Sequence, residues 1–138
     1  MTRQEFSRMI SDKRKEKGIS IKNVCDVMNF TTSGYSAINT ARHNYNMKLC
    51  LDYISASGAS LIFNVWKDDK KTKILNYEQL VTYLIDRRKQ MGFSTYYMGK
   101  AMNSSGSMVR HMENFSSTVS IDMLLKMCEV LELRLELS

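Results

Sequence analysis

The chain carries one pattern twice, and this repeat limits its fold more than any other feature. When the sequence is shifted by 74 positions against itself, ten residues fall on identical residues without a gap. Several of these residues are types that cap helices or form tight turns, so the match predicts two structural units of one design. The identical pairs are Asp12 and Asp86, Arg14 and Arg88, Lys15 and Lys89, Gly18 and Gly92, Ser20 and Ser94, Met28 and Met102, Asn29 and Asn103, Ser33 and Ser107, Leu51 and Leu125, and Leu61 and Leu135.

Each unit is expected to be mostly helical. The 138 residues include no proline and six glycines, which favours helices over a turn-rich β fold. In the first unit, apolar spacing and polar caps predict helices over 3–17, 20–28, 31–40 and 46–57. In the second unit, a helix carrying Leu84 ends at Gly92, and Ser94, Ser105 and Ser120 cap the helices that follow. Asn29 and Asn103 are expected in left-handed turns.

A strand is expected at the end of each unit. Leu61, Phe63 and Val65 stand at every second position, and so do the leucines at 133, 135 and 137. A period of two residues is typical of a β-strand. A lone strand leaves its backbone groups unpaired, so the two strands are expected to pair as an antiparallel ribbon about an approximate two-fold axis. A second chain could also pair through the strand edges. The predicted organisation is a first unit over 1–66, a charged linker over 67–76 that ends in a capping box at Asn76, and a second unit over 77–138.

Charge and composition limit the function. The net charge is +6, with nine basic and five acidic residues in 1–66, four and two in 67–76, and seven of each thereafter. This excess permits a polyanionic partner, attracted mainly to the first unit and the linker. Cys25, Cys50 and Cys128 have no metal-binding spacing, and the last two fall on apolar helix faces, where small core residues are expected. With no apolar run long enough to span a membrane and no signal-peptide core, the chain is expected in the cytoplasm and without membrane contact.

The order Leu84, Arg88, Gly92 and Ser94 resembles the lambda-repressor-like, or XRE-type, helix-turn-helix domains. The resemblance covers nearly the whole second half and implies a mostly α fold of two tandem helix-turn-helix bundles, each ending in a strand. In that family, the arginine of the first helix pairs with a glutamate that ends the DNA-reading helix; these positions correspond to Arg88 and Glu113. The terminal strands are similar to those of HipB-like antitoxins, which pair across a dimer, so one chain would imitate a dimer and is expected to be prokaryotic or phage-encoded.

The resemblance also implies a DNA-binding surface. Two reading helices about one DNA turn apart, roughly 34 Å, would enter successive major grooves of a near-symmetric operator. Only Arg110 is a strong bidentate reader of guanine, so modest sequence discrimination is expected. The implied base contacts are Thr32, Ser33, Ser36 and Ala37 in the first unit and Gly106, Ser107, Arg110 and His111 in the second. The implied phosphate contacts are Lys22, Arg42, His43, Asn44 and Asn114.

The chain departs from the family pattern at several positions. Asn39 stands where the glutamate partner of Arg14 would be, so the first unit is expected to lack the ion pair. Ile21 and Thr95 replace a glutamine that commonly contacts DNA. Gly34 and Gly106 lie inside the reading helices, where each costs about 0.5 to 1 kcal/mol relative to alanine.

The leading hypothesis is a non-enzymatic, double-stranded DNA-binding transcriptional repressor that needs no cofactor or metal. An alternative keeps the fold but uses methionine-rich, aromatic or strand-edge surfaces to bind a protein partner, as an antitoxin or antirepressor would. An enzyme is the third class; no catalytic triad, carboxylate pair, phosphate loop or metal-ligand spacing supports it.

Overall fold

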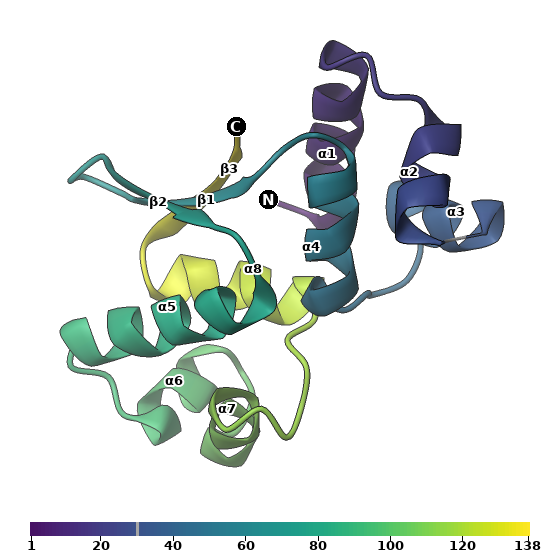
Figure 1. The fold of residues 1–138 in the computed structure, drawn as a ribbon. Helices are drawn as coiled ribbons and strands as arrows, with labels where there is room; N and C mark the ends of the chain where they lie inside the picture. Colours follow the sequence, from purple (N-terminus) through teal and green to yellow (C-terminus); the bar gives the residue numbers. More distant parts are fainter. Residues whose placement is uncertain (30) are drawn as a thin grey trace.

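A computed structural model describes residues 1–29 and 31–138, apart from the side chain of Thr32. The described residues form eight α-helices and a three-stranded antiparallel sheet (Figure 1). The elements of the first half are α1 (Arg3–Glu16), α2 (Ile21–Met28), α3 (Thr32–Thr40), α4 (Met47–Ala56), β1 (Leu61–Val65) and β2 (Lys70–Ile74). Those of the second half are α5 (Tyr77–Gln90), α6 (Thr95–Ala101), α7 (Gly106–Glu113), α8 (Ile121–Val130) and β3 (Leu133–Leu137).

The helices of the two halves follow the 74-residue repeat. The starts of α1, α2, α3 and α4 lie 74 positions before the starts of α5, α6, α7 and α8. Each start is fixed by a side-chain oxygen that accepts a hydrogen bond from a backbone N–H in the first turn, so the capping expectations are confirmed. The capping residues form the pairs Thr2 and Asn76, Ser20 and Ser94, Thr31 and Ser105, and Asn46 and Ser120.

Left-handed backbone conformations also recur at the same spacing. Gly18 and Gly92 have φ values of 70° and 73°, and Asn29 and Asn103 have 52° and 58°. These residue types adopt positive φ at low steric cost, which explains why the sequence marks the turns. Two further pairs, Ala41 with Phe115 and Gly58 with Glu132, adopt positive φ without sharing a residue type.

The sheet joins the two halves in the strand order β2-β1-β3. β1 and β3 pair antiparallel, with Leu61 opposite Leu137, Ile62 opposite Glu136 and Phe63 opposite Leu135. The ribbon expected from the sequence is therefore present. The repeat relates Leu61 to Leu135 and Phe63 to Leu137, so exchanging β1 with β3 turns the pair Leu61 and Leu137 into the pair Leu135 and Phe63. The register therefore has an approximate two-fold axis, which passes through the pair Ile62 and Glu136.

The segment expected as a charged linker needs a correction. Lys70–Ile74 within it is the strand β2, which pairs antiparallel with β1 from Leu61 opposite Ile74 to Val65 opposite Lys70. Backbone pairing with the existing strand overrides the low strand propensity of the lysines. The capping box is present at the end of this segment: Asn76 Oδ1 accepts from Gln79 N–H, and Gln79 Oε1 accepts from Leu75 N–H at 2.8 Å.

A second contact lies on the same pseudo-two-fold axis. The N-cap residues of α4 and α8, Asn46 and Ser120, form an antiparallel bridge. Met47 N–H donates to Val119 C=O and Ile121 N–H donates to Tyr45 C=O, both at 2.8 Å. These two bonds are related by the repeat, so the halves are held together symmetrically at the sheet and at the starts of two helices.

One hydrophobic core extends through both halves. It includes Phe6 and Tyr53 from the first half, Leu84 and Met112 from the second, and Phe63 from the sheet. Cys50 and Cys128 are buried in it, as expected. None of the helices in the described part of the chain has both the length and the apolar character needed to cross a lipid bilayer.

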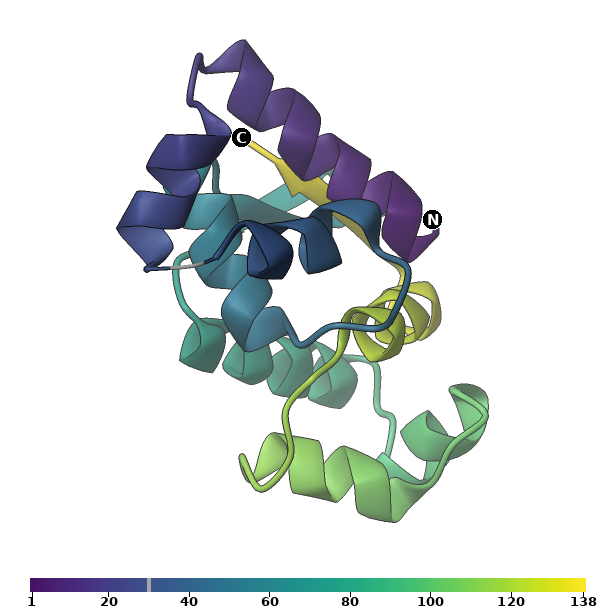
Figure 2. The ribbon, with the colours of Figure 1, turned by 90° about the vertical axis from the view of Figure 1, so that its right-hand side faces the viewer.

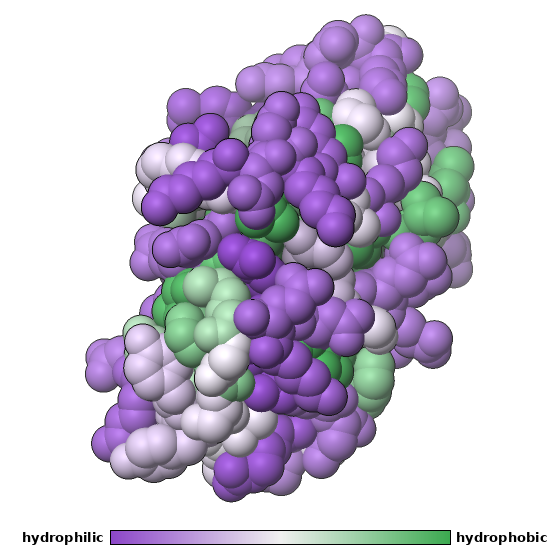
Figure 3. Space-filling view, turned by 90° about the vertical axis from the view of Figure 1, so that its left-hand side faces the viewer, coloured by the Kyte–Doolittle hydropathy of each residue, from purple (hydrophilic) through white to green (hydrophobic). Residues whose placement is uncertain are grey.

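The repeat places two helix pairs at separate ends of the molecule. Helices α2 and α3 lie at one end, and α6 and α7 lie at the other, with α4 and α8 between them (Figures 1 and 2). The face on the left of Figure 1 is mostly hydrophilic, with smaller apolar areas between the polar side chains (Figure 3).

Candidate nucleic-acid interface

Helix α3 exposes one polar face of small side chains. Thr31 Oγ1 caps the helix by accepting from Gly34 N–H at 3.1 Å, and Tyr35 and Ile38 are buried and fix which face points outward. The remaining face carries the exposed residues Ser33, Ser36 and Ala37. The side chain of Thr32, the fourth expected base contact here, lies outside what the structure describes.

The loop after α3 completes a groove on this face. Ala41 adopts φ of 52° and ends the helix, after which Arg42 and His43 are exposed. An open groove of about 440 Å³ brings together six of the expected contacts with two further residues; its lining comprises Ser33, Ser36, Ala37, Thr40, Arg42, His43, Asn44 and Tyr45. Lys22 is exposed on α2 but does not line the groove.

Two asparagines expected to bind phosphate also have structural roles. The Oδ1 atom of Asn44 accepts from the N–H groups of Tyr45 and Asp122, each at 3.1 Å, and so connects the two halves. Asn114 Oδ1 accepts from Ser116 N–H at 3.0 Å. Both residues are exposed, and the amide NH₂ group of each can donate hydrogen bonds.

Helix α7 presents a matching face with more basic character. Ser105 caps it through Met108 N–H, and Val109 and Met112 are buried. The exposed side chains include the three expected base contacts Ser107, Arg110 and His111. Arg110 Nη1 lies 3.5 Å from Thr95 Oγ1, and His111 Nδ1 lies 3.0 Å from Ser116 Oγ.

Gly106 is a correction to the expected base contacts, because it is buried between α6 and α7. A Cβ atom added there would lie 2.9 Å from Tyr96 Cα, and one added at Gly99 would collide with the backbone of Ser105. Gly99 therefore allows α7 to approach α6 closely. Both glycines therefore serve the contact between α6 and α7.

The expected ion pair between Arg88 and Glu113 is present. Arg88 Nε donates to Glu113 Oε2 at 2.6 Å and Nη2 donates to Oε1 at 2.8 Å, which is a bidentate geometry. Arg88 Nη1 also donates to Phe93 C=O at 2.7 Å. The arrangement ties α5, the turn before α6 and the end of α7 into one unit.

Arg14 repeats only part of this arrangement. Its Nη1 donates to Ile19 C=O at 2.7 Å, as Arg88 does to Phe93. Its Nε is buried without a hydrogen-bond partner among the described residues. Asn39 is half-buried at the position that corresponds to Glu113. The first unit therefore lacks the ion pair, as the sequence predicted.

Acidic side chains are scarce on the two helix pairs. Asp26 is the one acidic residue in 18–46, and Glu113, which pairs with Arg88, is the one in 91–120. The other twelve carboxylates of the fourteen lie outside these two segments. Carboxylates on a surface repel a phosphate backbone. Because these two segments have few of them, a modest number of cations is enough to attract phosphate.

The buried cysteines lack the properties of nucleophiles. Burial raises the pKa of the Cys128 thiol to about 12 and also raises the pKa of Cys50. Both groups therefore remain thiols at neutral pH, whereas cysteine chemistry needs the thiolate.

Two groove residues, Thr40 and Tyr45, are missing from the contacts expected from the sequence. Thr40 lies four positions after Ser36 on the same helix, and its hydroxyl donates to Ser36 C=O at 2.8 Å. This spacing puts both residues on one face and could have identified Thr40. Tyr45 enters the groove through the path of the loop, where its hydroxyl lies 2.9 Å from Ser7 Oγ; no sequence signal marks it.

Comparison of the chain with protein-family models, with curated proteins and with solved structures found no match in any of the three.

Proposed function

We propose that the protein is a sequence-specific double-stranded DNA-binding regulator in which two helix-turn-helix units of one chain act as a pseudo-dimer. In this proposal, α2 and α3 form one helix-turn-helix and α6 and α7 form the other. The observation that carries the proposal is the repetition of an exposed, nearly acid-free helix face about a pseudo-two-fold axis. Duplex DNA has the same kind of local two-fold symmetry, so symmetric proteins read two half-sites.

The chemistry of the two faces fits different tasks. In the second unit, Arg110 would read guanine through two hydrogen bonds, and Ser107 would bond to one of several bases. In the first unit, Ser33 and Ser36 offer weak readers, while Arg42 and His43 beside them would contact phosphates. The second half-site should therefore supply most of the sequence preference and the first should supply affinity.

Binding to duplex DNA tests the proposal directly. We expect affinity that falls steeply with rising salt, measured by fluorescence anisotropy on duplexes selected from a random pool. Arg110→Ala should weaken the selected sequence by about 1 to 3 kcal/mol and leave random duplex nearly unchanged. Arg42→Ala should weaken all sequences alike and reduce the salt slope by about one.

A matched control uses a lysine on the sheet. Lys73→Ala removes an exposed positive charge on β2, away from both helix pairs, and should leave binding within error. Equal losses for all three variants would show a general charge effect and would exclude the proposed interface. No duplex affinity at low salt would exclude DNA binding itself. A partner protein that co-purifies in stoichiometric amount at high salt would instead favour the protein-interaction function.

A further inference from the structure

The two edges of the sheet differ in how they are protected. The β2 edge carries the exposed lysines Lys70, Lys71 and Lys73, and such an edge repels an added strand of the same kind. The β3 edge has the sequence Leu-Arg-Leu-Glu-Leu, with one charge of each sign. Nothing in its composition discourages strand addition.

The free backbone groups of the β3 edge follow from its register with β1. Trp66 N–H donates to Glu132 C=O and Ser138 N–H donates to Ser60 C=O, each at 3.0 Å. The backbone N–H and C=O groups of the even-numbered residues in 132–138 are therefore directed toward β1. Backbone direction alternates along a strand, so Leu133, Leu135 and Leu137 direct their N–H and C=O groups to the open edge. Within the described part of the chain, no bond from these groups to another segment is seen.

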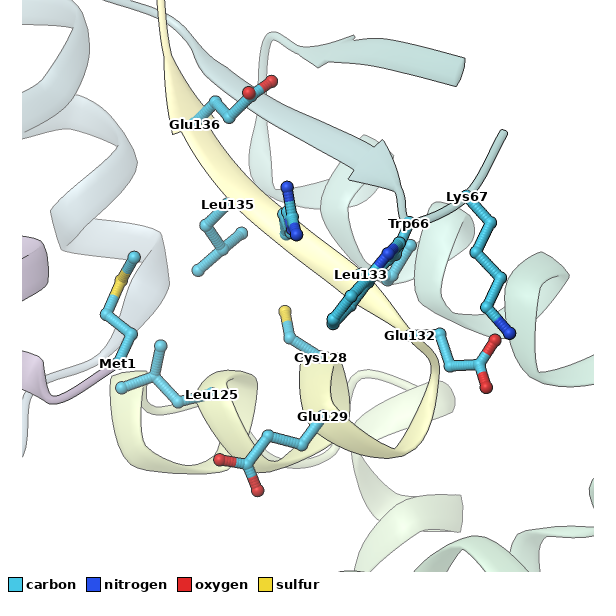
Figure 4. Close-up of a pocket in the computed structure, with 11 residues that line it drawn as sticks. Met1, Trp66, Lys67, Leu125, Cys128, Glu129, Glu132, Leu133, Leu135 and Glu136 are labelled. Carbon is cyan, nitrogen blue, oxygen red and sulfur yellow. The ribbon is translucent and has the colours of Figure 1, made fainter. Parts of the chain in front are cut away.

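An apolar groove runs beside this edge. It has a volume of about 690 Å³ and lies between β3, α8 and the exposed side chains of Met1 and Trp66. Figure 4 shows Leu133 and Leu135 directed toward the α8 side of the groove, where Cys128 and Leu125 lie. An incoming strand would therefore find both hydrogen-bonding groups and apolar surface.

We propose that a second copy of this chain adds its β3 antiparallel to this edge, centred on Leu135. In that register, the backbone N–H and C=O groups of Leu135 pair with those of Leu135 in the other copy, and those of Leu133 pair with those of Leu137. Arg134 then lies opposite the partner's Glu136, and Glu136 lies opposite the partner's Arg134. The strand is thus complementary in charge to itself, which selects a second copy as the occupant.

The resulting sheet would have six strands in the order β2-β1-β3-β3-β1-β2. Both of its outer edges would be the lysine-rich β2 strands, so assembly would stop at two chains. This closure is the physical reason for a dimer rather than a filament. The inference does not depend on DNA binding and can be tested without DNA.

The test uses charge variants of β3 and sedimentation equilibrium of the full chain. The wild type is expected to be a dimer that dissociates on dilution. Each dimer has two cross-strand pairs between positions 134 and 136. Arg134→Glu makes both of them pairs of carboxylates, and Glu136→Arg makes both of them pairs of cations. Each substitution should therefore weaken self-association by about tenfold or more. An equimolar mixture of the two variants should restore the dimer, because every cross-strand pair is then of opposite sign. Arg134→Glu/Glu136→Arg in one chain should restore it as well.

Lys73→Glu is the matched control, since it reverses a charge on the other edge of the same sheet, and it should dimerise like the wild type. Thermal melting by circular dichroism checks that each variant folds. Glu136→Arg needs this check most, because Glu136 Oε2, 3.5 Å from Lys71 Nζ, is itself buried although the two side chains are 37% and 53% exposed. A wild type that stays monomeric at millimolar concentration would overturn the proposal. Single variants that remain dimeric, or a mixture that fails to dimerise, would overturn the proposed register.

Discussion

Arg14 and Arg88 show how one residue difference changes the environment of a buried charge. Both arginines occupy the same position of the repeat, and both donate a 2.7 Å bond to a backbone carbonyl five residues later. Arg88 also has a carboxylate partner, whereas Arg14 Nε has no partner among the described residues. A buried donor without a partner costs free energy, so the first unit should be the less stable of the two.

Restoring the carboxylate in the first unit should therefore stabilise the protein. Asn39→Glu is expected to raise the free energy of unfolding by about 1 to 2 kcal/mol, because it supplies an acceptor to a buried guanidinium. Urea denaturation followed by circular dichroism measures the change. Asn39→Gln, which has the same length without the charge, should give much less; an equal gain from both variants would assign the effect to packing.

The reciprocal change in the second unit should destabilise it. Glu113→Gln removes one partner of a bidentate pair whose side chains are 10% and 14% exposed. Leaving the Arg88 charge unpaired should lower the free energy of unfolding by about 3 kcal/mol. Glu129→Gln, on an exposed position of α8, is the control and should change stability little. A small loss for Glu113→Gln would mean that solvent already screens the pair.

At the level of helices and strands, the sequence predicts local features well and non-local ones poorly. Ser20, Asn46 and Ser94 cap their helices through the adjacent turn, so their effect is visible in a few neighbouring residues. β2 is different, because its lysines have little strand propensity and it forms through pairing with β1. Gly106 also depends on the fold, since its contact is with the backbone of Tyr96.

The contact between α6 and α7 makes a prediction of its own. Gly99→Ala is expected to lower the free energy of unfolding by about 1 to 3 kcal/mol, because the added methyl group collides with the backbone at Ser105 and forces the helices apart. Thermal and urea denaturation measure the loss. Cys25→Ala at the corresponding position of the first unit is the matched control, since a Cβ atom is already accommodated there. A neutral Gly99→Ala would show that the two helices separate freely.

At the level of the whole molecule, one chain contains both halves of an approximately symmetric assembly. The halves meet at the pair Ile62 and Glu136 and at the bridge between Asn46 and Ser120, and they share one core. The repeat predicted the strand pairing, because each terminal strand needed a partner. It gave no sign of the bridge, which depends on the path of two polar loops. Because both units lie in one chain, each could diverge in sequence while the other stayed fixed.

That divergence makes the proposed operator asymmetric in a way that can be changed. Ser36 and Ala37 correspond to Arg110 and His111, so the substitutions Ser36→Arg and Ala37→His together transfer the basic pair from α7 to α3. If both helices read DNA, this double variant should gain a preference for guanine in the first half-site, worth about 1 to 3 kcal/mol. Selection from random duplexes should then return a more symmetric site than the wild type does. The converse variant, Arg110→Ser with His111→Ala, should lose the guanine from the second half-site. An unchanged site for the α3 variant would mean that the first unit contacts only the DNA backbone.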